Sequence, residues 1–431
     1  MSFWSVVPII ILFVLFFLKV PVAYSMIIAA ASYFLLAPGT MDPCSMIQKM
    51  ISSNSSFTYL AIPFFTCAGV VFGYSGITKR LMGLAEMIVG QMRGGMAQVN
   101  VLLSALMGGL SGSANADAAL QSKMLVPQME KLGYNRAFSC AVTAASSCIT
   151  PIIPPGIILI LYATASNVSV AKMFYAGYIP GIVITVTMMV LTWWISKKRN
   201  YKPSREKAAS GGEFGRAFID ALPALFVPFG LVLGLRFGIF TPTEAGAICV
   251  LYAIIIGMFV YKELKPSDIP KIIKESVVNT AGVMFILAGA QAFSIYLTWE
   301  RLPNMISEAI ISGISNPYVF LIVVNILLLI VGMFFDGGAA MILLAPLLVP
   351  AAQALGIDLI HFGIVLAVNL TIAGMTPPFG AMMFVSTSIT GTRIEDYTRE
   401  ALPYIAQLII CLLLITYIPQ IVTFLPNLLA G

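Results

Sequence analysis

Charged residues are scarce in this chain. Asp, Glu, Lys and Arg together make up 10% of its 431 residues, whereas hydrophobic residues make up 59%. Soluble domains carry about 25% charged residues. The composition therefore excludes an ordinary soluble enzyme and predicts an all-α polytopic membrane protein in contact with the lipid bilayer. The net charge of +6 does not indicate nucleic-acid binding, because the basic residues follow a membrane-topology pattern.

The chain also lacks the residue patterns of metal centres, disulfide scaffolds and ATPases. His361 is the sole histidine, and no Walker A motif is present. The six cysteines have no metal-type spacing, and most lie in apolar segments, so we predict neither a disulfide framework nor a cofactor. They are Cys44, Cys67, Cys140, Cys148, Cys249 and Cys411.

A cleavable leader is not indicated either. The first apolar stretch, 3–18, has no basic residue before it and no small-residue cleavage site after it, so we predict a retained helix. A spanning helix needs about 20 apolar residues. Segments that meet this need lie near 3–18, 20–38, 57–76, 137–165, 173–196, 217–238, 244–261, 278–298, 362–390 and 401–425.

The distribution of basic residues predicts the orientation. The run from Lys197 to Lys207 is assigned to the cytoplasm, since cytoplasmic loops are enriched in Lys and Arg. Five predicted spans precede this run and five follow it, which places both termini outside, on the side that is the periplasm in a bacterial inner membrane. With this count, 20 of the 24 Lys and Arg residues fall on the cytoplasmic side. The exceptions are Lys49, Lys172, Arg236 and Arg301.

The chain repeats itself at an offset of 223 residues. Between 125–180 and 348–403, 12 of 56 positions are identical without a gap, and the pair Pro154-Pro155 returns as Pro377-Pro378. Five spans per half make the two repeats inverted. We predict a first repeat at 1–196, a cytoplasmic, solvated linker at 197–216 and a second repeat at 217–431. Matching Gly/Pro breaks in two halves are typical of secondary transporters.

Two stretches differ from simple spans. Residues 96–132 and 318–354 each consist of two short apolar arms joined by small polar residues. We interpret both as re-entrant hairpins, the first open to the cytoplasm and the second to the outside. The spans 137–165 and 362–390 are broken at the Pro-Pro pairs. Non-helical backbone at membrane depth is tolerated only where it lines a cavity or is buried in protein.

The hairpin tips and the breaks provide candidate ligands. Their hydroxyls, amides and freed carbonyls suit a hard cation such as Na⁺, and the half-helix after each break directs its positive end at an anion. We predict the first cation site at Ser111, Ser113, Asn115, Thr150 and Pro154. We predict the second at Asp336, Gly337, Gly338, Gly374 and Thr376. We predict substrate binding by Ser113, Asp117, Pro155, Gly156, Pro378 and Gly380.

Other interpretations remain open. Gly, Pro and Ser are common packing residues in membrane helices. Asp117 and Asp336 are intramembrane carboxylates and hence functional candidates, but each alternatively caps the helix that follows it. The Gly109-Leu110-Ser111-Gly112 segment matches the G-x-S-G pattern of intramembrane serine proteases, with His361 as the possible base. An anion channel is a further, less favoured alternative.

Four motifs resemble those of one transporter family. The segments Gly108–Ser113, Ala116-Asp117, Ile153–Gly156 and Thr376–Gly380 are similar to the large membrane subunit of tripartite ATP-independent periplasmic (TRAP) transporters, and the resemblance covers essentially all 431 residues. It implies a bacterial inner-membrane protein, not an enzyme, that imports organic anions coupled to an ion gradient. It also implies a small four-helix membrane subunit, expected here as a separate chain, and a soluble periplasmic substrate-binding protein.

The same resemblance implies a substrate class and a mechanism. The family transports C4-dicarboxylates, sialic acid and other acids, and overall likeness favours sialic acid. It implies an elevator-type movement, for which we expect a transport domain of 96–165 plus 318–390 and a scaffold of the remaining spans. The amphipathic stretches 77–95 and 300–315 are expected to be interfacial arm helices beside the hairpins.

Overall fold

The computed structural model describes residues 3–18, 20–38, 40–55, 57–303, 305, 308, 313 and 316–429. Regular structure within these residues is helical throughout, which confirms the all-α prediction. The helices of the first half are α1 (Phe3–Phe17), α2 (Val22–Leu36), α3 (Pro43–Asn54), η1 (Phe57–Leu60), α4 (Ala61–Tyr74), α5 (Ile77–Val89), α6 (Gly95–Ser111), α7 (Ala114–Met124), α8 (Val126–Lys131), α9 (Arg136–Ser146), α10 (Ile157–Ala165) and α11 (Val170–Lys198).

The helices of the second half are α12 (Gly211–Arg236), α13 (Pro242–Ile255), η2 (Ile256–Val260), η3 (Pro266–Asp268), α14 (Ile269–Trp299), α16 (Pro317–Phe334), α17 (Gly337–Ala354), α18 (Leu359–Met375), α19 (Ala381–Thr390), α20 (Ile394–Tyr417) and α21 (Gln420–Leu429). In the second half, the helices from α16 to α20 repeat the order of the helices from α6 to α11. From α6/α16 to α11/α20, equivalent helices begin close to the same offset of 223 residues.

Fewer helices have the length of a membrane span than the ten we predicted. Within the described residues, seven helices are long and apolar enough, or eight if the bent pair α4–α5 is one span. The reason is length: α1 and α2 have 15 residues each, and both Pro-Pro spans are divided in two. By contrast α16 and α17, expected as hairpin arms, reach 18 residues each. The protein is a multi-pass membrane protein.

The expected arm at 77–95 contains a helix that leaves its predecessor at a steep angle. α5 departs from α4 at 70°, and the left-handed Gly76 (φ 77°) makes the corner. Arg80 forms an ion pair with Glu263, and its guanidinium lies 4.1 Å from the Tyr261 ring centroid, which fixes the bend. The other expected arm, 300–315, lies largely outside the described residues.

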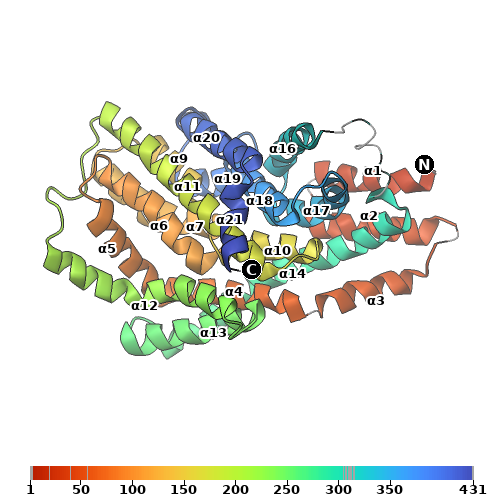
Figure 1. Cartoon of the computed structure of the whole chain (residues 1–431), viewed down its shortest axis with the longest axis horizontal. Helices are drawn as coiled ribbons and strands as arrows, with labels where there is room; N and C mark the ends of the chain where they lie inside the picture. The colour runs from red at the N-terminus through yellow and green to blue at the C-terminus, as the bar shows by residue number, and fades with distance from the viewer. Residues whose placement is uncertain are drawn as a thin grey trace.

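The two broken helices form the centre of the molecule. Every residue of α9 from Ala137 to Ser146 is buried, as is every residue of α18 from His361 to Met375. In Figure 1, α18 and α19 lie in the middle of the ribbon. Cys148 lies 3.4 Å (Sγ to O) from the Thr371 carbonyl, and these two residues are 223 positions apart. The two repeats therefore meet at equivalent positions.

Residues 201–204 of the linker between the halves are held against the rest of the protein by stacking and hydrogen bonds, although the linker is predicted to be solvated. The Tyr201 ring stacks on Tyr134 with centroids 4.5 Å apart, and the Tyr134 hydroxyl donates to the Lys202 carbonyl at 2.6 Å. Burial raises the pKa of Tyr134 to about 12, so this phenol remains a donor at neutral pH. The Ser204 amide donates to the Gly90 carbonyl at 2.9 Å. Residues 201–204 thus join the end of α8 to the α5–α6 junction.

Candidate functional site

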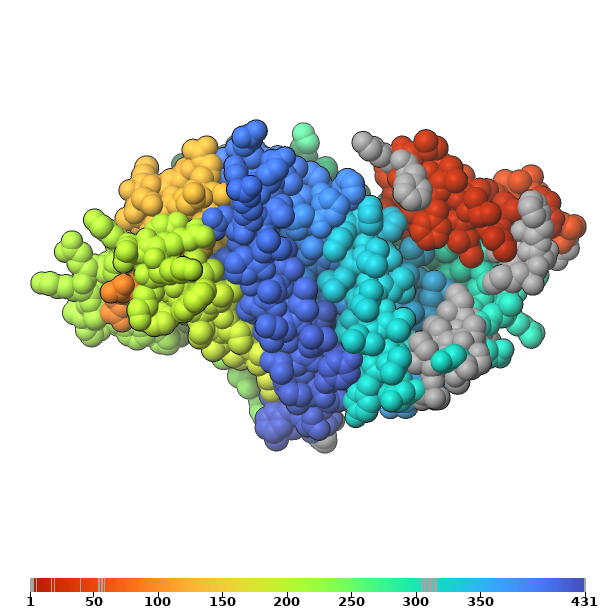
Figure 2. Space-filling view, turned by 90° about the horizontal axis from the view of Figure 1, so that it is seen from above, coloured from red at the N-terminus to blue at the C-terminus, as the bar shows by residue number. Residues whose placement is uncertain are grey.

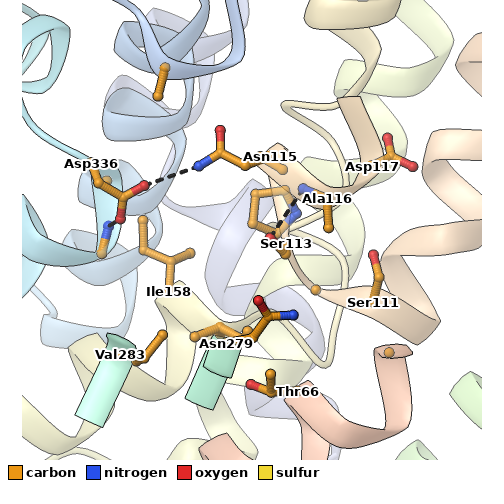
Figure 3. Close-up of a pocket in the computed structure, with 18 of the residues that line it drawn as sticks. Thr66, Ser111, Ser113, Asn115, Ala116, Asp117, Ile158, Asn279, Val283 and Asp336 are labelled. Carbon is orange, nitrogen blue, oxygen red and sulfur yellow. Dashed lines mark hydrogen bonds between the residues drawn. The ribbon is translucent and has the colours of Figure 1, made fainter. Parts of the chain in front are cut away.

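A cavity of about 760 Å³ lies where the hairpins face the helices α4 and α14. One wall is formed by α7, the tip of α17 and Gly374, and the opposite wall includes Thr66 and Asn279. Figure 3 shows the labelled tip residues Ser113, Asn115 and Asp336 near Asn279 and Thr66. The volume of the cavity lies in the range of small-molecule sites, about 300–1,000 Å³. The two predicted hairpins thus line one space.

The first hairpin turns at Gly112, between α6 and α7. Gly112 adopts a left-handed conformation (φ 57°), which an L side chain rarely adopts. A Cβ atom there would also overlap the Pro155 carbonyl oxygen, and the Gly112 carbonyl accepts from the Ile157 amide at 3.3 Å. The tip is therefore seated directly on the first Pro-Pro break. The buried Ser111 hydroxyl has no hydrogen-bond partner among the described residues.

Asp117 does not cap α7, because Ser113 occupies the cap and accepts from the Ala116 amide at 3.4 Å. Asp117 is instead buried at 1% exposure. Its carboxylate accepts from the Ser104 hydroxyl and from the Gln121 amide, both at 2.8 Å. Figure 3 shows the carboxylate turned away from Asn115 and Asp336. An uncompensated carboxylate at membrane depth costs about 2.5–3.5 kcal/mol, and these donors offset that cost by tying α7 to α6.

Asp336 does cap the helix that follows it. Its Oδ2 accepts from the Gly338 amide at 3.0 Å at the start of α17. Its Oδ1 accepts from the Asn115 side-chain amide at 3.2 Å. This contact joins the two hairpin tips, which are 221 residues apart in sequence. The carboxylate is exposed to the cavity, so it remains available to a cation.

The hairpins pack crosswise on the broken helices. The arms α6 and α16 lie against α9 and α18 of their own halves, whereas α7 lies against α19 and α17 against α10 of the opposite halves. A Cβ on Gly338 would lie 3.1 Å from the Leu161 side chain of α10. Gly338 has no positive φ, unlike Gly112. Each tip is therefore held by both halves of the chain.

Both breaks depend on a glycine that begins the next helix. Gly156 precedes α10, and a Cβ there would overlap the Pro151 carbonyl oxygen. Gly380 precedes α19, and a Cβ there would meet the Gly374 carbonyl oxygen. Pro151 and Gly374 occupy equivalent positions in the repeats, and both line the cavity. The Pro154-Pro155 and Pro377-Pro378 peptide bonds are cis.

The predicted site residues divide into two groups. Those that line the cavity are Ser111, Ser113, Asn115, Asp117, Asp336, Gly337, Gly338 and Gly374. Those that do not are Thr150, Pro154, Pro155, Gly156, Thr376, Pro378 and Gly380. The second group lies in the breaks behind the tips; the Thr150 hydroxyl, for example, donates to the Ser104 carbonyl at 3.2 Å. Pro378 is exposed but lies outside the cavity lining.

The opposite wall of the cavity was missed by the sequence reasoning. Thr66 is a polar residue in the otherwise apolar helix α4, and that contrast is the signal that identifies it, whereas Asn279 follows the charged first turns of α14 and has no such signal. Tyr74, Lys123 and Glu275 line another part of the cavity. Lys123 is the single basic residue among the described residues that line it.

The protease alternative finds no geometric support. The His361 Nε2 atom lies 2.9 Å from the Ile415 carbonyl, and its backbone amide is bound to Asp358, so no Ser111–His361 pair is formed. Over the ranges given above for the described chain, no group of three or more His, Cys, Asp or Glu side chains has the arrangement of a metal site.

Comparison with known sequences identifies a family. The family model described as the tripartite ATP-independent periplasmic transporter, DctM component, matches residues 9–421. The chain is 36% identical over 417 residues to the sialic acid TRAP transporter large permease protein SiaM of Vibrio cholerae, covering 97% of each chain. It is 36% identical over 398 residues to the C4-dicarboxylate large permease protein DctM of Pseudomonas aeruginosa, covering 92% of each.

Longer relatives and solved structures extend the comparison. The isethionate TRAP transporter permease protein DctMQ of Oleidesulfovibrio alaskensis is 34% identical over 94% of this chain and 64% of its own length. The fold is similar to the YdaH transporter of Alcanivorax borkumensis (TM-score 0.63, 14% identity, covering 96% and 98%) and to MtrF of Neisseria gonorrhoeae (TM-score 0.58, 12% identity, covering 95% and 94%).

Proposed function

The chain belongs to the DctM family of tripartite ATP-independent periplasmic transporters, and from this premise we propose that it imports a carboxylate anion together with Na⁺. As a member of this family it is a bacterial membrane permease for an organic anion, not an enzyme. The observation that carries the proposal is the contact between Asn115 and Asp336. It brings the polar tips of both hairpins to one wall of a cavity large enough for a small acid.

We propose sialic acid as the first candidate substrate, since the likeness to the sialic acid permease covers 97% of this chain, and a C4-dicarboxylate, whose permease covers 92%, as the second. Relatives named for these two substrates are equally similar, at 36% identity. Uptake of a panel of labelled organic acids into proteoliposomes tests the choice. Preferential accumulation of sialic acid supports the proposal, whereas preferential accumulation of a dicarboxylate replaces sialic acid by the second candidate.

Energetics support coupling to a cation, for which we propose Na⁺. Each negative charge moved into a negative interior costs about 2.3 kcal/mol per 100 mV. Two co-transported Na⁺ ions reverse the sign for a monoanion, and the two hairpin tips offer two places for them. Replacement of Na⁺ by K⁺ should abolish uphill uptake, and undiminished accumulation in K⁺ would rule out Na⁺ as the coupling ion. Uphill accumulation also distinguishes this carrier from a channel, which only equilibrates.

We propose the first cation site at the α6–α7 tip and the second at the α17 tip. The unpartnered Ser111 hydroxyl supports the first, since it offers a lone pair at the tip. The exposed Asp336 carboxylate, together with the backbone around Gly374, supports the second. Carboxylate, hydroxyl and carbonyl oxygens are the ligands that hard cations prefer.

An elevator movement is proposed in which the cavity lies between the moving and fixed parts. The hairpins and broken helices (96–165 and 318–390) form the moving part, and α4 and α14 belong to the scaffold. The moving part also packs against α11 and α20 of the proposed scaffold. The Gln98 side chain of α6 donates to the Met189 carbonyl of α11 at 3.0 Å, and Tyr397 of α20 donates to the Met375 carbonyl at 2.9 Å.

Two partners complete the proposed transporter. A TRAP large permease works with a small membrane subunit and a periplasmic binding protein, and the DctMQ relative carries a name that joins two of these components.

The distribution of basic residues supports inverted repeats with periplasmic termini. Accessibility of single cysteines near residue 3 and residue 428 to an impermeant thiol reagent in intact cells tests this orientation. If neither position is labelled, the predicted periplasmic orientation of the termini is rejected.

A further inference from the structure

A narrow apolar groove of about 330 Å³ runs along the surface between α11 and α20. Its floor contains the small side chains Thr187 and Cys411, and its walls contain Val190, Trp194, Ile410 and Leu414. Three of these wall residues are more than half exposed: Val190 at 62%, Trp194 at 57% and Ile410 at 58%. Figure 2 shows α20 (dark blue) beside the yellow-green α11 on one face of the molecule.

The floor of the groove is fixed by hydrogen bonds between the two helices. The Thr187 hydroxyl lies 3.2 Å from the Cys411 sulfur, and the Gln407 side chain donates to Thr187 at 2.8 Å. One turn further along, Thr192 and Tyr404 are bonded at 3.1 Å. Small residues on the floor and large ones on the walls make the surface concave. Because hydrogen bonds join the two helices at the floor, the groove has a defined shape.

One end of the groove is basic. The Lys197 ammonium lies 5.0 Å from the Trp193 ring centroid, and the Lys198 ammonium lies 5.7 Å from the Trp194 centroid. Arg199 is neutralised by Glu400 at 2.8 Å. Among the ion pairs of the described residues, none uses Lys197 or Lys198. Trp beside Lys at the end of a spanning helix is the arrangement found at the lipid headgroup level.

We infer that this groove binds an anionic phospholipid, with its phosphate at Lys197 and Lys198 and one acyl chain along the groove. From Lys197 to Thr187 the helix rises about 15 Å, so the groove extends from headgroup depth into the hydrocarbon region. A phosphate headgroup is complementary to Lys197 and Lys198, neither of which forms an ion pair among the described residues, and an acyl chain is complementary to the apolar groove. Charge complementarity thus favours a lipid over a protein segment.

The experiment measures lipid binding to the purified chain, so its outcome is independent of transport. Retained lipid is counted by native mass spectrometry after exchange into detergent with added phosphatidylglycerol or phosphatidylcholine of the same chain length. We expect preferential retention of phosphatidylglycerol. In the double variant Lys197→Gln/Lys198→Gln this preference should fall by about thirtyfold, since each basic residue near an anionic headgroup contributes about fivefold.

A second variant tests the groove itself. Val190→Trp fills it with an exposed side chain that does not touch the core, and it should reduce retention of both lipids. Ile182→Trp, at an exposed position of α11 outside the groove, is the matched control and should bind as the parent does. Lys172→Gln, at the opposite end of α11, is the control for the lysine pair.

Three results would overturn the inference. They are equal retention of the two lipids by the parent protein, an unchanged preference in the lysine double variant, and unchanged binding in Val190→Trp. A fourth concerns the other possible occupant. If a cysteine at position 190 forms a disulfide with a scanned cysteine of the small membrane subunit in membranes, a protein helix covers the groove and the lipid assignment is wrong.

Discussion

The tips of the two hairpins occupy equivalent positions in their repeats, but their chemistry differs. Ser113 and Asp336 are equivalent, and both cap the helix that follows, α7 and α17. One cap is a neutral hydroxyl and the other a carboxylate. The first tip is pressed onto a Pro-Pro break through left-handed Gly112, whereas no residue of the second tip has a positive φ. The duplicated fold thus preserves the capping geometry while the charge has diverged.

The buried carboxylate differs as well. Asp117 lies inside the first hairpin, bonded to Ser104 and Gln121, and its equivalent in the second hairpin is Ala340. The first hairpin therefore carries its acidic group in its interior, as a brace between two arms. The second carries it at the tip, exposed to the cavity. We therefore predict that the two tips are not interchangeable, and the following variants test this prediction.

The largest effect is expected from alanine at the two tips. Gly112→Ala should abolish uptake and lower the free energy of unfolding by about 3 kcal/mol, because the left-handed conformation alone costs about 1–2 kcal/mol and Cβ also overlaps Pro155. Gly337→Ala should stay within about twofold of the parent, since its nearest neighbour would be 3.5 Å away. Thermal unfolding in detergent and proteoliposome uptake measure both. Equal losses of stability and uptake in the two variants would show that the two tips do not differ in this respect.

Exchange of the caps tests the charge. Asp336→Ser should raise the Na⁺ concentration needed for half-maximal uptake by roughly tenfold to a hundredfold, because a carboxylate near a bound cation is lost. The hydroxyl still caps α17, so folding should be retained. Ser113→Asp places the charge at the other tip. Restoration of normal Na⁺ dependence in the double exchange would show that the tips are equivalent.

A smaller effect is expected inside the first hairpin. Asp117→Asn keeps the shape but turns an amide donor toward one of its two present donors, so stability should fall by about 1–3 kcal/mol. Ala340→Ser at the equivalent position should be nearly neutral. Thermal unfolding measures the pair. If Asp117→Asn instead leaves stability intact but removes Na⁺ dependence, Asp117 is a ligand and not a brace.

The smallest effect is expected from the contact between the tips. Asn115→Ala should weaken apparent Na⁺ affinity by about threefold to tenfold, the value of one hydrogen bond, without affecting membrane insertion. A double-mutant cycle with Asp336→Ala isolates the pairwise term. Additive effects of the two changes would show that the 3.2 Å contact does not couple the sites.

The sequence located the tips and breaks because Gly, Pro and small polar residues act locally. The Pro-Pro pairs and the Ser111–Asp117 segment stand out in any apolar context. The crosswise packing of α7 on α19 and α17 on α10 leaves no such local pattern, and neither does the approach of Thr66 and Asn279 to the tips. The number of spans was overestimated because apolar composition does not reveal where a helix stops.

The docked linker limits how far the hairpin domain can move in the proposed elevator movement. Lys202 is bound to Tyr134 beside the first hairpin, and α12 of the proposed scaffold begins after its cap, Ser210. The residues 203–209 between these anchors reach at most roughly 25 Å when fully extended. They work as a tether of fixed length. In the proposed elevator movement, any vertical stroke of the hairpin domain past α12 must stay within this reach. Use of its full length requires Ser204 to release Gly90, and a longer stroke also requires Tyr134 to release Lys202.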